Sequence, residues 1–277
     1  MKITDINGSV KLNNGLNIPY LGLGVYKIKD GEEVFNAVQY ALDAGYRYID
    51  TASAYFNEKG VGRAINEHRI PREEIFVSTK VWNSEQGYDN TIKSFNKSLD
   101  RLNMEYIDLY LQHWPVKGKF KETWKAMETL YEEGKIKAIG VCNFLQFQLE
   151  DLMSFSKIKP TINQVEFHPY LTQESLQKFC KKENIQIQSW FPLMHGEAFK
   201  IEGFQELATK YHRSVSQLLL RWNLQKDIII IPKSKSKTHI IENSELFDFE
   251  ISREDMSFLD SFDSNLRMGP NPANFNF

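Results

Sequence analysis

Cysteine is nearly absent from the sequence. The only two cysteines, Cys142 and Cys180, lie far apart in a chain of 277 residues and show no paired spacing. This scarcity excludes a disulfide framework and favours a reducing compartment, so we expect a cytoplasmic protein. A chain of this length can bury roughly three quarters of the surface that it exposes when unfolded, so its fold needs no covalent cross-link.

A strong charge and long apolar runs are absent as well. The formal net charge is −2, which argues against the basic face that nucleic-acid binding requires. No apolar run approaches the roughly 18 residues of a membrane-spanning helix, and the first residues, MKITDINGSVKL, contain no apolar stretch of signal-peptide length. We therefore expect a soluble protein with neither a nucleic-acid nor a membrane partner.

The sequence also lacks a domain boundary and the motifs of several common sites. No linker rich in Pro, Gly or Ser divides the chain, so residues 1–277 are expected to form one domain. The serine-hydrolase motif G-x-S-x-G is missing, and only Asp50 and Glu166 are candidates for the carboxylate pair of a glycosidase. The histidines follow no metal-binding pattern, so no metal is expected; they are His68, His113, His168, His195, His212 and His239.

The sequence does contain a regular alternation of short apolar runs and amphipathic stretches. The start, SVKLNNGLNIP, has the turn residues of a β-hairpin. In amphipathic stretches such as GEEVFNAVQYALDAG, apolar residues recur three and four positions apart, as they do in helices. The apolar runs predict strands at residues 21–25, 46–50, 75–79, 107–112, 136–141, 161–167, 185–191 and 228–232. Strands that alternate with helices form parallel sheets, and this number of units predicts an α/β fold of the (β/α)8 or TIM-barrel type.

A doubly wound dinucleotide-binding sheet is the main alternative fold. Its fingerprint, G-x-G-x-x-G, should follow the first strand. Gly22 and Gly24 supply the first half of that motif, but Lys27 stands in the third glycine position. A second candidate begins at Gly60 and has Ile65 in that position. The barrel is therefore the better prediction.

Polar, ionisable or aromatic residues end most of the predicted strands. Taken singly, each has an ordinary explanation: Asp50 could cap the next helix, and a lysine at a strand end is usually a solvated side chain. Their recurrence indicates a site, because the carboxyl ends of barrel strands meet at one mouth, where barrel enzymes carry their catalytic residues. In chain order these residues are Asp50 with Tyr55 after it, Lys80, His113 with Trp114, Cys142 with Asn143, Gln164 with Glu166, Trp190, and Lys233 with Ser234.

The motifs around these residues resemble those of the aldo-keto reductase family, in its prokaryotic and broad-specificity form, along essentially the whole chain. GYRYIDTASAY is similar to the family signature G-Y-R-H-I-D-T-A-x-x-Y, while STKVWN and LQHWP resemble the stretches that carry the family's lysine and histidine. The resemblance implies a barrel with an N-terminal hairpin and with a C-terminal tail over the active-site face. It also implies a catalytic tetrad, consisting of Asp50, Tyr55, Lys80 and His113. Tyr48 replaces the signature histidine, and together with Phe56 it is expected to be free to vary.

The reaction that this resemblance implies is hydride transfer from a nicotinamide to a carbonyl carbon, with Tyr55 as the acid that protonates the oxygen. A tyrosine with a pKa near 10 is a weak acid at neutral pH, and we expect the Lys80 ammonium to lower the pKa of Tyr55. Asp50 would pair with Lys80 and offset the cost of burying its charge. His113 would donate a hydrogen bond to the carbonyl oxygen.

The resemblance further implies a cofactor site, assigned to Cys142, Asn143, Gln164, Trp190, Lys233, Ser234, His239, Glu242 and Asn243. Asn143 and Gln164 would hold the nicotinamide carboxamide, and Trp190 would stack on the ring. Cys142 stands where serine is usual, and a thiol is the weaker hydrogen-bond donor. Because the residues after Trp190 depart from the family pattern, the loop that covers the cofactor is expected to differ.

His239 bears on the choice of cofactor. It stands where many relatives carry an arginine for the 2′-phosphate of NADPH, and arginine offers a charged fork where neutral histidine offers one donor. Lys233 remains close to that position in the sequence, and Lys235 and Lys237 add positive charge. We therefore expect NADPH to be preferred by a smaller margin than in those relatives, with NADH as an alternative.

The substrate is expected to be a small molecule with a carbonyl group. Tyr26, Trp82 and Trp114 would wall the pocket, and the tail GPNPANFNF would close one side. Such a pocket suits aldehydes and ketones with apolar parts and dicarbonyls such as methylglyoxal. The family habit suggests a monomer.

Two other classes of function stay open on the sequence alone. One is a regulatory protein that keeps the barrel and senses the cofactor. The other is a different barrel enzyme, in which Lys80 forms a Schiff base with its substrate.

Overall fold

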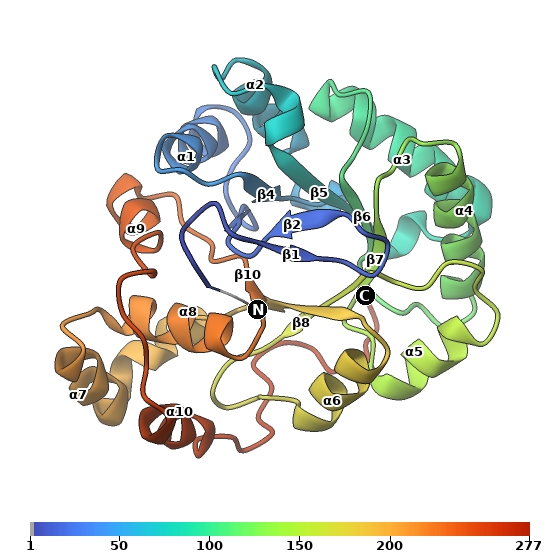
Figure 1. The fold of residues 1–277 in the computed structure, drawn as a ribbon. Coiled ribbons are helices and arrows are strands. Elements are labelled where there is room, and N and C mark those ends of the chain that lie inside the picture. Colours follow the sequence, from blue (N-terminus) through green and yellow to red (C-terminus); the bar gives the residue numbers. More distant parts are fainter. Residues whose placement is uncertain (1–2) are drawn as a thin grey trace.

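Eight parallel strands close into a ring in the computed structural model, which describes residues 3–277 (Figure 1). The strands lie side by side in the order of the sequence, from β3 to β10. Parallel bridges between Leu21 and Ile230 and between Gly24 and Lys233 join the two ends of this sheet, and the Gly22 amide donates to the Ile230 carbonyl at 2.9 Å. The predicted (β/α)8 barrel is confirmed.

The barrel strands overlap all eight predicted ranges, although most are shorter than predicted. They are β3 (Leu23–Gly24), β4 (Tyr48–Asp50), β5 (Phe76–Val81), β6 (Leu109–Gln112), β7 (Ile139–Cys142), β8 (Ile162–Glu166), β9 (Gln186–Trp190) and β10 (Ile229–Ile230). The hairpin strands β1 (Ser9–Lys11) and β2 (Asn17–Pro19) pair antiparallel as predicted, across a turn in which Gly15 has φ of 89°.

Helices connect the strands and form the outer ring in Figure 1. They are α1 (Glu32–Asp43), α2 (Glu58–Asn66), α3 (Tyr88–Leu102), α4 (Phe120–Glu132), α5 (Gln146–Met153), α6 (Glu174–Lys182), α7 (Glu202–Lys210), α8 (Val215–Gln225), α9 (Lys237–Glu242) and α10 (Arg253–Asp260). Short 3₁₀ segments lie at Ser53–Tyr55, Arg72–Glu74, Asn83–Glu85 and Met194–Lys200. Across residues 3–277, no helix combines the length and the apolar character that crossing a membrane requires.

Helix α1 illustrates how the sequence pattern builds these connections. Its buried residues recur three and one positions apart, which gives one apolar stripe that faces the barrel; they are Val34, Ala37, Val38, Ala41 and Leu42. The helix stops two residues before Gly45, whose φ of 96° suits glycine, and the Tyr46 amide then donates to the Ala41 carbonyl at 2.9 Å. This turn directs the chain into β4.

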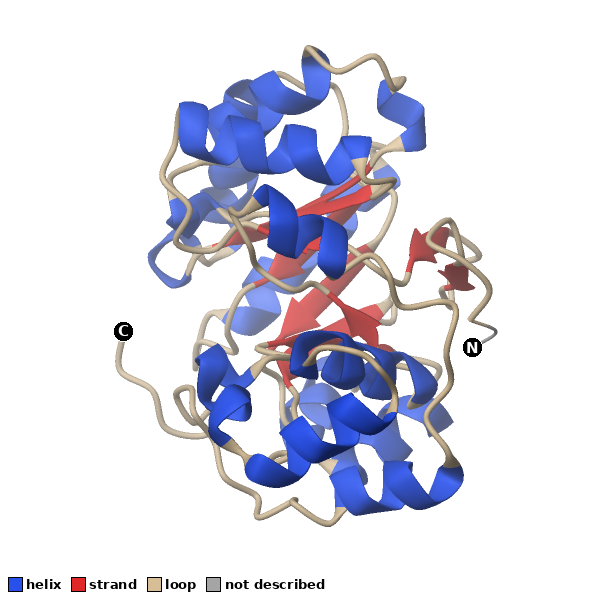
Figure 2. Ribbon diagram, turned by 90° about the vertical axis from the view of Figure 1, so that its left-hand side faces the viewer, coloured by secondary structure: helices blue, strands red, loops and turns tan. Residues whose placement is uncertain are grey.

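The two ends of the barrel are covered differently, as the side view shows (Figure 2). The hairpin covers the end where the strands begin: the Asn13 and Asn14 side-chain amides donate to the carbonyls of Pro160 and Lys137, which precede β8 and β7. The C-terminal segment lies at the opposite end, where the strands finish. The hairpin thus covers the first end, and a catalytic site is expected at the second, where the strands finish.

Candidate active site

A cavity of about 1170 Å³ opens at the carboxyl ends of the strands. Its size suits a dinucleotide together with a small substrate. Most of the residues predicted for the site line it, namely Tyr26, Asp50, Tyr55, Trp82, His113, Trp114, Asn143, Gln164, Trp190, Lys233, Ser234, His239, Glu242 and Asn243. Lys80 and Cys142 are the exceptions, since both are buried behind the lining.

A chain of hydrogen bonds leads from Asp50 through Lys80 to the cavity. The Lys80 Nζ donates to Asp50 Oδ1 at 2.6 Å, to the Thr51 carbonyl at 2.8 Å and to the Tyr55 hydroxyl at 3.3 Å. These bonds use all three hydrogens of the ammonium group, and Lys80 is 0% exposed. Asp50 and Lys80 therefore form a buried ion pair, and the Tyr55 phenol joins the Lys80 ammonium to the cavity.

The second carboxylate oxygen of Asp50 is also occupied. Ser78 Oγ donates to Asp50 Oδ2 at 2.7 Å, and Gln164 Nε2 donates to the same oxygen at 3.0 Å. Both partners are side chains from other barrel strands, and neither is a helix amide. The explanation of Asp50 as a helix cap is therefore wrong for this structure.

Burial and charge act against each other on Lys80 and on Tyr55. Burial lowers the pKa of Lys80, but attraction to Asp50 and Tyr55 outweighs burial and holds that pKa above its ordinary value. Burial raises the pKa of Tyr55, and the opposing effect of the Lys80 charge does not cancel it. Lys80 lowers the pKa of Tyr55 as expected, but it does not bring that pKa below the ordinary value, because desolvation of the phenol is the larger effect.

His113 lies beside Tyr55 as a neutral imidazole. The centroid of the His113 ring lies 5.8 Å from that of the Tyr55 ring and 5.0 Å from that of the Trp82 ring. Burial, together with the positive charge of Lys80, holds the pKa of His113 well below its usual value. Its Nδ1 is buried and has no hydrogen-bond partner among the described residues, so the tautomer with the proton on Nε2 avoids an unpaired donor.

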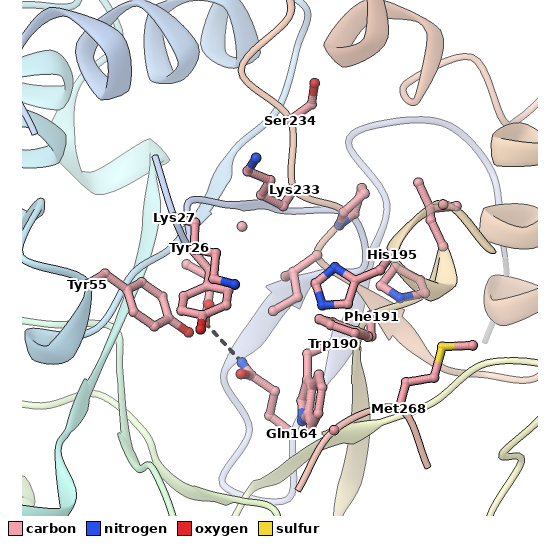
Figure 3. A pocket seen from close by; sticks show the side chains of 18 of the residues that line it. Tyr26, Lys27, Tyr55, Gln164, Trp190, Phe191, His195, Lys233, Ser234 and Met268 are labelled. Carbon is pink, nitrogen blue, oxygen red and sulfur yellow. Dashed lines mark hydrogen bonds between the residues drawn. The ribbon is translucent and has the colours of Figure 1, made fainter. Parts of the chain in front are cut away.

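The side chains expected near a nicotinamide are held in place by one another. Trp190 Nε1 donates to Asn143 Oδ1 at 2.8 Å, and Asn143 Nδ2 donates to the His113 carbonyl at 3.1 Å. Figure 3 shows Trp190, Gln164 and Tyr55 around one part of the cavity, with Lys233 and Ser234 in another. An aromatic face, amide groups and a lysine thus line one continuous space.

Several lining residues were not predicted from the sequence. The segment after β9 departs from ordinary backbone geometry, since Phe191, Met194 and His195 have φ of 67°, 53° and 52°. Phe191 and His195 both line the cavity, as does Ser214, the N-cap of α8, whose hydroxyl accepts from the Gln217 amide at 3.2 Å. The capping sequence SVSQ was the available signal for the start of α8, but nothing local indicated that this helix end reaches the mouth of the barrel.

Glu166, at the end of β8, holds the C-terminal tail over the site by hydrogen bonds to its backbone. Glu166 Oε1 accepts from the Met268 amide at 2.5 Å and from the Gly269 amide at 3.1 Å. Further along, the Phe277 ring stacks on Trp82 at 5.9 Å and meets Trp114 edge-on at 5.1 Å. The expected tail over the active-site face is confirmed, and it closes the aromatic side of the cavity.

The described residues offer no metal centre: no group of three or more His, Cys, Asp or Glu side chains within residues 3–277 is placed to hold an ion. The polar groups that line the cavity include phenols, imidazoles, amides, hydroxyls, lysines and the carboxylates of Asp50 and Glu242.

Comparison with known proteins places this chain among the reductases. The model of the Aldo/keto reductase family matches residues 20–264. The glyoxal reductase of Bacillus subtilis is 50% identical over 97% of this chain and 98% of its own length, and the methylglyoxal reductase DkgA of Escherichia coli is 40% identical over 96% and 97%. A Bombyx mori aldo-keto reductase, solved in complex with NADP, superposes with a TM-score of 0.88 at 34% identity, over 99% of this chain and 100% of its own.

These matches span nearly the whole chain at high identity. The chain belongs to the aldo-keto reductase family and is an oxidoreductase of that family. The resemblance found in the sequence motifs is confirmed.

Proposed function

We propose that this protein reduces small aldehydes and ketones, including dicarbonyls such as glyoxal and methylglyoxal, to alcohols with NADPH. The observation that carries this proposal is the Tyr55 phenol, which lines the cavity and accepts a hydrogen bond from the buried Lys80–Asp50 pair. Relatives named glyoxal reductase and methylglyoxal reductase favour dicarbonyl substrates. One barrel domain, acting as a monomer, carries all the residues that the reaction needs.

A nicotinamide held beside Trp190, Asn143 and Gln164 would supply a hydride to the carbonyl carbon. Tyr55 donates its proton to the carbonyl oxygen, so a C–H and an O–H bond form while the C=O double bond becomes single. The phenolate that remains is stabilised by the Lys80 ammonium 3.3 Å away, and a solvent proton later restores the phenol. Because burial raises the pKa of Tyr55, the phenol keeps its proton until negative charge develops on the substrate.

His113 would orient the carbonyl group. As a neutral imidazole with its proton on Nε2, it can donate one hydrogen bond to the carbonyl oxygen, and that bond strengthens as the oxygen gains charge. The charge of Lys80 helps to keep His113 neutral and therefore in this donor form.

The residues present suit a nicotinamide dinucleotide. Gln164 uses Nε2 to bond Asp50 and Gln188, which leaves its Oε1 to accept from the carboxamide. The Trp190 ring would pack on the nicotinamide, and Cys142, directly behind Asn143, would support this end without reaching the cavity.

The other end of the cavity suits the adenosine part of the cofactor. Lys233 and Ser234 would meet the phosphate, and Glu242 and Asn243 the adenine. The exposed His239 lines the cavity without an arginine's fixed charge, and Lys235 is engaged by Glu33 at 2.8 Å. We therefore expect a modest preference for NADPH over NADH.

Aromatic walls define the substrate end. Tyr26, Trp82 and Trp114 surround the space beside Tyr55 and His113, and their faces suit short, partly apolar carbonyl compounds. A Schiff base on Lys80 is the weaker alternative, because a nucleophilic amine would need to lose its proton and its bond to Asp50. A cofactor sensor without catalysis is weaker too, since the complete proton-transfer chain would then serve no purpose.

Tyr55→Phe tests this function. We expect kcat/KM for glyoxal and methylglyoxal to fall by a factor of about 10³, while NADPH still quenches the tryptophan fluorescence with a similar Kd. Tyr110→Phe is the matched control, because Tyr110 is a fully buried phenol that packs edge-on against Phe95 away from the cavity. Retained turnover in Tyr55→Phe would refute the assignment of the acid, and no turnover of any carbonyl by the unmodified protein would refute the function.

A further inference from the structure

Inside the barrel, directly below the site, five buried side chains close a ring of hydrogen bonds. The members come from four strands and are at most 3% exposed: Tyr48 and Asp50 on β4, Ser78 on β5, Gln164 on β8 and Gln188 on β9. TIM-barrel interiors are usually filled by Val, Ile and Leu, so a polar layer is an unusual choice.

The ring follows from strand register and from the pleat. Asp50 lies beside Ser78 in the β4–β5 pairing, and Gln164 lies beside Gln188 in the β8–β9 pairing. Tyr48 precedes Asp50 by two residues and so points to the same side of β4. The Tyr48 side chain reaches across the barrel interior and joins the two pairs. Its hydroxyl oxygen lies 3.0 Å from Ser78 Oγ and 2.8 Å from Gln188 Nε2.

Only one arrangement of hydrogens satisfies this ring. The ionised Asp50 can only accept, so the single hydroxyl hydrogen of Ser78 goes to Asp50 Oδ2. Tyr48 must then donate to Ser78 Oγ, and the Tyr48 oxygen accepts from Gln188 Nε2.

The remaining bonds close the ring through Gln164. Gln188 Oε1 accepts from Gln164 Nε2 at 2.9 Å, and the second Nε2 hydrogen goes to Asp50 Oδ2 at 3.0 Å. Two chains of donors therefore converge on one carboxylate oxygen, and each bond polarises the next.

The ring fixes two things that the reaction uses. It holds the plane of the Asp50 carboxylate, whose other oxygen bonds Lys80 at 2.6 Å. It also fixes the side-chain amide of Gln164, which is labelled beside the cavity in Figure 3, with Oε1 as the atom left for a ligand. Burial and the nearby Asp50 charge hold the pKa of Tyr48 well above its usual value, so this phenol remains a donor.

We propose that Tyr48 and Gln188 are positioning residues of the reductase reaction, which hold Asp50 through Ser78 and Gln164 in the geometry that pairs it with Lys80. This inference rests on the proposed function, because it assigns these residues a part in the same proton transfer. Tyr48 is fully buried and bonded to two members of the ring, so this proposal replaces the expectation that it is free to vary.

The test compares Tyr48→Phe with Tyr46→Phe. Tyr46 is a matched control: it is 1% exposed and donates one hydrogen bond to the Ile240 carbonyl at 3.0 Å, outside the ring. Both variants lose a buried phenol hydroxyl, so both should lower Tm. Only Tyr48→Phe should lower kcat for NADPH-dependent glyoxal reduction, by about tenfold, and with the KM for glyoxal unchanged.

The split between kcat and KM separates positioning from packing. Ser78→Ala removes the direct hydrogen bond to Asp50 Oδ2, so it should lower kcat at least as far as Tyr48→Phe, with the KM for glyoxal unchanged.

A double variant checks the route through Ser78. If Tyr48 acts through Ser78, then Tyr48→Phe should lower kcat no further in a Ser78→Ala background. Gln188→Met should lower kcat and also raise the KM for NADPH, because Gln164 then loses the partner that orients its amide. An equal effect of Tyr48→Phe in both backgrounds would contradict the route.

An infrared measurement keeps this test independent of turnover. The antisymmetric carboxylate stretch of Asp50, assigned with Asp50→Asn, should change frequency in Tyr48→Phe, because Ser78 then donates a weaker hydrogen bond to Asp50 Oδ2, and should not change in Tyr46→Phe. An unchanged band and an unchanged kcat would overturn the positioning role, whatever happens to Tm. Absence of carbonyl reduction by the unmodified protein would instead overturn the proposed function, and the infrared band would still show whether Tyr48 acts on Asp50.

Discussion

Replacement of Asp50 by asparagine removes one charge at nearly constant shape, and its consequences can be worked out from three contacts. Every neighbour of the carboxylate is a donor: Lys80 at 2.6 Å on one oxygen, and Ser78 at 2.7 Å with Gln164 at 3.0 Å on the other. An asparagine amide group must face donors on one side or the other. The variant therefore leaves a fully buried ammonium without its counter-charge, which costs about 3–5 kcal/mol of unfolding free energy.

The pH dependence of this loss has a definite sign. In the unmodified protein burial lowers the pKa of Lys80, but the combined attraction of Asp50, Tyr55 and Cys142 outweighs burial and holds that pKa above its ordinary 10.5. The charged pair thus stabilises the fold fully below pH 10.5 and loses this effect as the pH rises through the folded-state pKa. In Asp50→Asn burial remains without the attraction of Asp50, so the pKa of Lys80 should fall below 10.5 and the two stability curves should converge at alkaline pH.

Asp50→Asn should lower kcat as well as the free energy of unfolding. A Lys80 that has lost its proton no longer stabilises the Tyr55 phenolate, so we expect kcat to fall by a factor of about 10² or more. Urea unfolding between pH 7 and 11 and steady-state NADPH oxidation would measure the two effects.

Glu58→Gln is the control, because Glu58 is another buried carboxylate and lies away from the cavity. Its two oxygens accept from the Arg101 guanidinium and from the Thr79 hydroxyl, each at 2.6 Å. It should lose stability with kcat within about twofold of the unmodified value. An Asp50→Asn protein with full activity, or an equal loss of kcat in Glu58→Gln, would refute the reasoning.

Three further outcomes are expected. In Gly269→Ala the new Cβ would lie 2.5 Å from the Trp190 ring and 3.1 Å from Glu166 Oε2, so the tail should shift. The Kd for NADPH should then rise by about tenfold, with an unchanged Tm. An unchanged Kd would show that the position of the tail does not affect cofactor binding. The folded-state pKa of His113 is depressed, so the protein should lose up to about 1.4 kcal/mol of unfolding free energy per pH unit as the pH falls below 6.5. His113→Gln should flatten this slope, as measured by urea unfolding. Equal slopes in the variant and the unmodified protein would contradict a neutral imidazole at His113. His239→Arg should raise the ratio of kcat/KM with NADPH to that with NADH by about tenfold, and an unchanged ratio would mean that residue 239 does not meet the 2′-phosphate.

The order of elements was readable from the sequence because it depends on local patterns. Apolar stripes such as that of α1 and glycines such as Gly45, which has a positive φ, specify each helix and its end with little help from distant residues. Strand ends were less accurate: the run LGLGV predicted a strand over residues 21–25, but only Leu23 and Gly24 form β3. Pairing with β4 on one side and β10 on the other decides that length, and neither partner is adjacent in the sequence.

The site was partly readable for a similar reason. Asp50, Tyr55 and Lys80 carry family motifs, and the rule that parallel strands finish at one mouth brings them together before any coordinates are known. The backbone of the segment after Trp190 was not readable, since Phe191 and His195 adopt a left-handed conformation that their residue types rarely take and so do not predict.

The sequence by itself determined the repeating strand–helix order, the barrel and the residues that meet at its mouth, because periodicity and short motifs are local properties of the chain. Only the tertiary structure decided which of those residues act on one another and with what sign. The pKa of Tyr55 depends on how completely the fold removes water from the phenol, which outweighs the charge of Lys80. Tyr48 gains its role only because closure of the barrel brings Gln188, 140 positions further along the chain, to within 2.8 Å of its hydroxyl.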